Sequence, residues 1–200
     1  MFDPYIGEQW AVSGNILGGL RLLILGESHY SSDTTVLGKT TPGATKDVVR
    51  EFINGERRRF FTGLTQVIAG KHRSTMTQQE IEAVWASVAF YNYVPVYVAD
   101  GARERPSRDM FMAGGKPFEQ VLSTLQPQAI LVCGYELWGW LIRGLPNAPH
   151  KPWETMSPHK VGSAPAMRMM HPSANFFSST KWRPAFEDLC RQAKSTEPAS

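Results

Sequence analysis

The sequence predicts an α/β protein, a three-layer sandwich in which helices flank a central, mainly parallel sheet. Four short apolar runs of strand length predict the strands: residues 21–26, 87–94, 129–134 and 166–171. Helix-like patterns lie between these runs, and strands that alternate with helices form parallel βαβ units. We expect four strands in the sheet order 2-1-3-4, numbered along the chain, within one domain over residues 1–200.

The helices are predicted from apolar residues at helical spacing and from start and stop signals. Residues 45–55 end at Gly55, a stop signal, and residues 77–87 open with Thr77 and Glu80, the pattern of a capping box. The other predicted helices are 60–70, 116–126, 136–144 and 183–194.

Composition and the absence of long apolar runs indicate the class of protein and its expected compartment. The chain has 200 residues, 42% of them hydrophobic, which is enough for a substantial core. No apolar run approaches the roughly 20 residues of a membrane span. The N-terminal sequence MFDPYIGEQW lacks the basic start and apolar stretch of a signal peptide. We therefore expect a cytoplasmic protein that does not act at a membrane.

The two cysteines, Cys133 and Cys190, form no CxxC motif and have no metal-type spacing. We expect no disulfide framework, no metal and no iron–sulfur cluster, and hence no cofactor. The formal net charge of +3 permits a nucleic-acid partner without requiring one. We expect the protein to be a monomer.

Polar side chains follow all four predicted strands, with Tyr135 and Glu136 directly after the third. Residues 27–30, with the sequence ESHY, come directly after the first strand, Asn92 lies near the end of the second, and His171 and Ser173 follow the fourth. In open α/β sheets, ligands bind outside the carboxyl ends of the strands. The sequence therefore predicts one polar site assembled from separate segments.

Several of these residues have more than one interpretation. Glu27 could be a general base, a residue that positions water or a helix cap, and His171 could be an active-site cation or an ordinary loop histidine. Asn is depleted in strands, and the donor and acceptor of an Asn92 amide suit the edge of a nucleobase. Of Phe60 and Phe61, one could belong to the core and the other could stack on a base.

Six segments, taken in order, resemble the uracil-DNA glycosylase superfamily. They are LLILGES, FFTGLTQVI, AFYNYVP, RPSRD, PFEQVLSTLQPQAILVCG and HPSANFF, and the similarity spans roughly residues 21–190. The resemblance implies that Phe61 stacks on a flipped base, that Asn92 reads the edge of this base, and that His171 faces the leaving base. Tyr30 stands where the strict uracil enzymes keep a tyrosine that excludes thymine.

The first motif departs from the family at two positions. Some branches place Asp or Asn where this chain has Ser28, and His29 replaces the usual proline. Glu27, directly after the glycine, is the candidate that orients water, and Ser28 could help to hold this water. We count His29 among the candidate base-binding residues. It could be a second acid–base group, or it could simply be a surface residue.

Residues after the HPS motif are candidates for contacts with DNA. Phe176 and Phe177 could wedge into the duplex or anchor a packed loop, while Ser173, Lys181 and Arg183 could contact phosphates. The expected function is a DNA glycosylase-like hydrolase that removes uracil or another damaged base. The alternatives are an inactive nucleic-acid or nucleobase-binding module and an unrelated hydrolase that uses Ser28 with His29 or His171.

Overall fold

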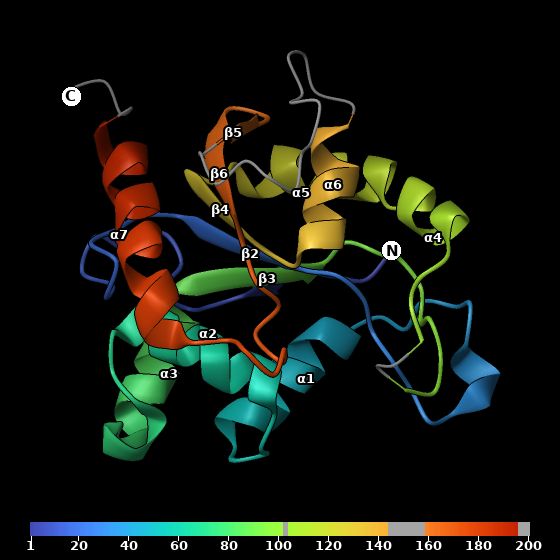
Figure 1. Cartoon of the computed structure of the whole chain (residues 1–200), viewed down its shortest axis with the longest axis horizontal. Helices are drawn as coiled ribbons and strands as arrows, with labels where there is room; N and C mark the ends of the chain where they lie inside the picture. The colour runs from blue at the N-terminus through green and yellow to red at the C-terminus, as the bar shows by residue number, and fades with distance from the viewer. Residues whose placement is uncertain (102–103, 144–158, 196–200) are drawn as a thin grey trace.

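The computed structural model describes residues 1–101, 104–143 and 159–195, and its architecture is α/β (Figure 1). Within these residues, six strands form one mixed sheet. In sheet order they are β1 (Tyr5–Ile6), β3 (Val88–Asn92), β2 (Leu22–Gly26), β4 (Ala129–Cys133), β6 (Ala164–Met169) and β5 (His159–Val161). The four central strands run parallel, whereas β1 and β5 pair antiparallel at the two edges.

The predicted α/β class is confirmed, but the sheet is larger than the four strands expected. The four predicted strands form its centre, in the order β3-β2-β4-β6, and the prediction missed both edge strands. Strand β1 has two residues and β5 has three. Strands this short are below the window in which a hydrophobic period can be recognised.

Helices cover both faces of the sheet (Figure 1). Leu22 and Ile24 of β2 point to a core shared with α1, α2, α3 and α7, whereas Leu23 and Leu25 point to a core shared with α4, α5 and α6. Successive residues of a strand alternate between faces, and a parallel sheet covered on both faces is apolar throughout. The bounds of these helices are α1 (Ala44–Ile53), α2 (Arg59–Ala69), α3 (Gln78–Ala86), α4 (Arg108–Ala113), α5 (Gly115–Leu125), α6 (Tyr135–Ile142) and α7 (Ser179–Ser195).

The helices follow the predicted ranges with two differences. The capping box of α3 is confirmed: the Thr77 hydroxyl accepts from Glu80 N, and the Glu80 carboxylate accepts from Thr77 N. Helix α4 was not predicted, because its six residues are too few to display a helical period. Helix α7 begins at Ser179 rather than at 183. None of the helices in the described ranges is long and apolar enough to cross a membrane.

Gly26 lies where β2 and β3 end side by side. In the parallel register Gly26 is the partner of Asn92. A Cβ at Gly26 would lie 2.2 Å from Asn92 Oδ1 and 3.0 Å from the Phe90 ring. The pairing continues past both strands, because Tyr93 N donates to Gly26 O and Val94 N donates to Glu27 O. The missing side chain therefore makes room for the Asn92 amide.

We expect Gly26→Ala to lower the free energy of unfolding by about 1–3 kcal/mol, because the added methyl group overpacks the contact with Asn92. Urea unfolding followed by circular dichroism measures this change. Gly139→Ala in α6 is the matched control, since a Cβ there meets no atom within 4 Å. The control should be neutral or stabilising by up to about 1 kcal/mol, and equal stability of the two variants would contradict the prediction.

Candidate functional site

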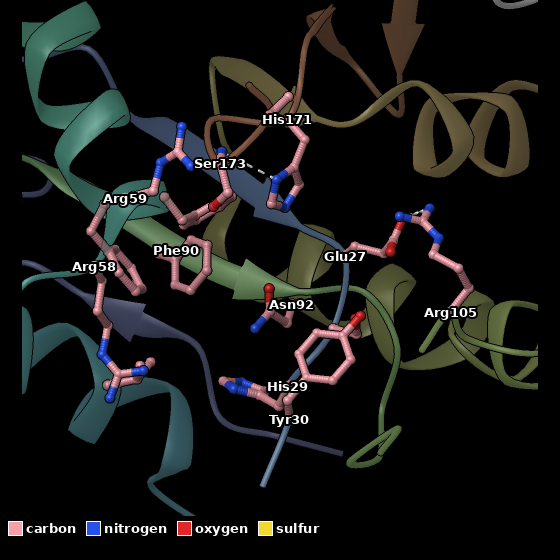
Figure 2. Close-up of a pocket in the computed structure, with 15 residues that line it drawn as sticks. Glu27, His29, Tyr30, Arg58, Arg59, Phe90, Asn92, Arg105, His171 and Ser173 are labelled. Carbon is pink, nitrogen blue, oxygen red and sulfur yellow. Dashed lines mark hydrogen bonds and ion pairs between the residues drawn. The ribbon is translucent and has the colours of Figure 1, made fainter. Parts of the chain in front are cut away.

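A pocket of about 570 Å³ opens at the carboxyl ends of β2, β3 and β6 (Figure 2). The predicted residues that line it are Glu27, Ser28, His29, Tyr30, Phe61, Asn92, His171 and Ser173. The lining also includes Val48, Arg58, Arg59, Phe60, Phe90, Arg105 and Ala174. The structure thus brings together the polar residues that follow three different strands.

The Asn92 side chain occupies the middle of the lining residues, with Glu27 and Arg105 on one side and Arg58 and Arg59 on the other (Figure 2). Asn92 is only 6% exposed. Within the described part of the chain, no group hydrogen-bonds to its amide. The amide atoms of Asn92 are not among the fully buried polar atoms that lack a partner, so they reach the open pocket. Its donor and acceptor are thus available to a ligand.

Glu27 is a buried carboxylate with an arginine partner. Its side chain is 6% exposed, and its Oε2 accepts a hydrogen bond of 2.9 Å from Arg105 Nη2. The same nitrogen donates to Glu136 Oε2 of α6 at 2.5 Å. Burial raises the pKa of Glu27 above its ordinary value, the positive charge of Arg105 opposes this rise, and Glu136 adds to it.

His171 follows β6 and is held by its own loop. Its Nδ1 accepts a hydrogen bond of 3.3 Å from the backbone N–H of Ser173. A neutral imidazole in this arrangement carries its proton on Nε2, which makes Nε2 a donor. Burial, together with the charge of Arg105, lowers the pKa of His171 to about 4. The ring is therefore neutral at physiological pH.

Two adjacent phenylalanines line the pocket in different ways. Phe61 is 5% exposed and stacks on Phe52 with ring centroids 5.5 Å apart, so most of its surface belongs to the core. Phe60 is half-buried, and its ring centroid lies 5.1 Å from that of His171. The more accessible ring beside His171 thus belongs to Phe60, while the predicted role of Phe61 as the stacking residue stays a prediction.

His29 is a buried link between β2 and α1. Its Nε2 lies 2.9 Å from the hydroxyl of Thr45 in the first turn of α1, and its ring meets Phe2 edge-on at 4.4 Å. Burial, with a smaller effect of Arg58, lowers the pKa of His29 to about 4. At 7% exposure His29 is no surface residue, so that interpretation was wrong.

Ser28 and Tyr30 interact with each other. The Ser28 hydroxyl donates to the Tyr30 hydroxyl at 3.1 Å. Among the described residues, the Ser28 hydroxyl bonds to no histidine. A serine nucleophile needs a base within hydrogen-bond reach, so this geometry does not support the hydrolase alternative that pairs Ser28 with His29 or His171.

The loop after His171 separates the two candidate wedge residues. Phe177 packs on α2, where a Cβ at Gly63 would lie 2.9 Å from its ring and 3.1 Å from Cβ of Pro172. Phe176 is 90% exposed. Phe177 therefore anchors the loop, and Phe176 projects from it.

The two basic candidates on α7 also differ. Nη1 of Arg183 donates to the carbonyls of Val67 and Ile68 at the end of α2, and its Nε donates to Glu187. A phosphate contact by Arg183 would have to compete with these bonds. Lys181 is exposed in the first turn of α7.

Sequence reasoning missed the role of Arg105 in the pocket and left open which of Phe60 and Phe61 faces it. Arg105 belongs to the RPSRD segment, which resembled a family motif, but nothing in the sequence indicated its partners. Helix periodicity alone did not tell which of the two phenylalanines faces the pocket. In the described ranges, no group of three or more His, Cys, Asp and Glu residues could hold a metal ion.

No family model matches the chain, and no curated protein matches it. The geometry of the pocket and the ordered segments that line it are therefore the basis for a functional proposal.

We expect the free energy of unfolding to fall as the pH is lowered from 6.5 to about 4. The unfolded chain binds protons at His29 and His171 in this window, whereas the folded protein does not. For His29 the loss is about 3 kcal/mol at pH 4. Urea unfolding at several pH values measures this loss.

The variant His29→Gln isolates the contribution of this residue, because glutamine can still hydrogen-bond to Thr45 but does not titrate. Its unfolding free energy should fall less steeply than that of the wild type over the same window. An identical pH dependence in the two proteins would contradict a buried neutral His29.

Proposed function

We propose that this protein is a DNA glycosylase-like hydrolase that removes uracil or another damaged base by cleaving the N-glycosidic bond. The observation that carries the proposal is the convergence of three groups on one pocket: the unpaired amide of Asn92, the neutral imidazole of His171 and the carboxylate of Glu27. They come from the ends of three different strands, in the chain order of the resembling family.

The leaving base departs as an anion, so the site must supply a donor where negative charge develops. His171 suits this role as a neutral donor, because its Nδ1 is occupied by Ser173 N and its proton therefore lies on Nε2. We infer that His171 stabilises the base anion.

The sugar passes through an oxocarbenium-like state, which a nearby carboxylate favours. Glu27 is the candidate for this role and for orienting the attacking water. Ser28 uses its proton on Tyr30, so its oxygen lone pairs can accept a hydrogen bond from the same water. Neither residue needs a metal ion for these tasks.

Recognition of the base falls to Asn92 and the aromatic wall. An amide presents one donor and one acceptor side by side, which matches the adjacent N–H and C=O on the edge of uracil. Phe61, with Phe60 beside it, would stack on the base. Tyr30 is hydrogen-bonded to Ser28. Its ring would exclude a base whose substituent points toward Tyr30, such as the methyl group of thymine.

The base must first leave the duplex, which costs a few kcal/mol of unstacking. Phe176 is the candidate wedge because its ring is 90% exposed beside the pocket loop. Ser173 in the pocket wall and Lys181 on α7 are candidates for phosphate contacts. His29 would support the pocket through Thr45 rather than touch the base.

The direct test incubates the protein with oligonucleotides that contain uracil, hypoxanthine or xanthine, followed by alkali. We expect strand scission on at least one of them. His171→Ala should lower kcat by about 100-fold or more, through loss of a preorganised donor. Asn92→Ala should lower kcat/KM by about tenfold or more, through loss of contacts to the base edge.

His72→Ala is the matched control, because His72 is an exposed histidine outside the pocket. No scission on any substrate at stoichiometric protein would contradict the proposal. Salt-sensitive DNA binding without product would instead favour an inactive binding module. One observation favours that alternative: Arg105 already occupies one oxygen of the Glu27 carboxylate.

Replacing each of the two loop phenylalanines with alanine tests whether Phe176 acts as a wedge. Phe176→Ala should leave stability within about 0.5 kcal/mol of the wild type, because the ring is exposed. Its activity should fall about tenfold or more on duplex DNA and much less on single strands, where no unstacking is needed. Phe177→Ala should lose about 1–3 kcal/mol of stability, through its contact with α2.

Steady-state kinetics on matched duplex and single-stranded substrates, with thermal unfolding, separate the two effects. Equal losses on both substrates for Phe176→Ala would argue against a wedge.

A further inference from the structure

Arg105 joins two carboxylates that come from different parts of the fold. It lies in the segment before α4, Glu27 follows β2, and Glu136 lies in the first turn of α6. One nitrogen, Nη2, bonds to Oε2 of both carboxylates, at 2.9 Å and 2.5 Å. Figure 2 shows the guanidinium of Arg105 reaching the carboxylate of Glu27 at the side of the pocket.

The three side chains differ in their access to water. Glu27 is 6% exposed, whereas the side chains of Arg105 and Glu136 are 54% and 47% exposed. A buried carboxylate without a counter-charge is strongly disfavoured. Arg105 therefore carries positive charge from the surface to a buried anion. Glu136 competes for the same nitrogen from the solvent side.

Arg105 and His171 both line the pocket. The charge of Arg105 disfavours a second positive charge on His171, and burial of this imidazole acts in the same direction. Two other titratable or charged groups of the pocket have partners of their own. The hydroxyl of Tyr30 bonds to Ser28, and Arg58 pairs with Glu51 and Glu56. One guanidinium thus favours an anionic Glu27 and a neutral His171 together.

We propose that Arg105 is a positioning residue that holds Glu27 as a carboxylate through this ion pair, and that Glu136 weakens this hold by sharing the guanidinium. The consequence for catalysis rests on the proposed function. The protonation states themselves do not, and they can be measured without any substrate.

The test is a pH titration of the Glu27 carboxyl carbon and of the His171 ring by NMR in three proteins. In Arg105→Gln, the pKa of Glu27 should rise and that of His171 should rise, because a positive charge is removed. In Glu136→Gln, the pKa of Glu27 should fall, because a negative charge is removed and Arg105 is left to Glu27 alone. General structural damage would not move Glu27 in opposite directions in the two variants.

Activity provides a second readout. The acid limb of the kcat/KM profile should move to higher pH in Arg105→Gln and to lower pH in Glu136→Gln. Arg105→Lys should restore most of the wild-type profile, because it keeps the charge. Arg108→Gln is the matched control, since Arg108 is an exposed arginine outside the pocket, and it should leave both titrations unchanged.

The outcomes separate this inference from the proposed function. Opposite shifts of Glu27 in a protein that releases no base would support the inference and reject the proposed function. Base release with an unchanged Glu27 titration in both Arg105→Gln and Glu136→Gln would reject the inference alone. If Arg105→Gln fails to fold, the Glu136→Gln titration decides, and a rise or no change in the pKa of Glu27 there overturns the inference.

Discussion

Strands β2 and β3 approach so closely at Gly26 that a Cβ there would lie 2.2 Å from Oδ1 of Asn92. This approach lets the Asn92 amide lie across the end of β2. The backbone bonds from Tyr93 to Gly26 and from Val94 to Glu27 keep the two segments paired beyond the strands. The amide and the carboxylate therefore reach the pocket from neighbouring positions on rigid backbone, which is what a preorganised site requires.

The electrostatics of the pocket are organised around Glu27. Burial favours its protonated form, and the nearby guanidinium of Arg105 opposes this tendency. The same guanidinium and the burial of His171 keep that imidazole neutral. Charges act strongly in a partly buried pocket because the effective dielectric constant is lower than in water. A single surface arginine can thus influence both sides of the site.

The segment after His171 is held against α2 by two residues, while a third projects into solvent. Pro172 and Phe177 pack on Gly63 of α2, and this packing holds the loop against the helix that carries Phe60 and Phe61. The ring of the preceding residue, Phe176, is left in solvent. The wedge role proposed for Phe176 depends on this anchoring, because a ring on a fixed loop loses little order on binding.

The sequence by itself determined the α/β class, the four central strands and the positions of Glu27, Asn92 and His171 at the ends of these strands, because apolar runs and the residues behind them are local signals. The edge strands and α4 were missed because they are too short to show a period. Only the tertiary structure decided that Arg105 meets Glu27, 78 residues away. It also decided which ring of each phenylalanine pair is buried and that Arg183 bonds to the end of α2. These outcomes depend on packing between distant segments, which no local pattern encodes.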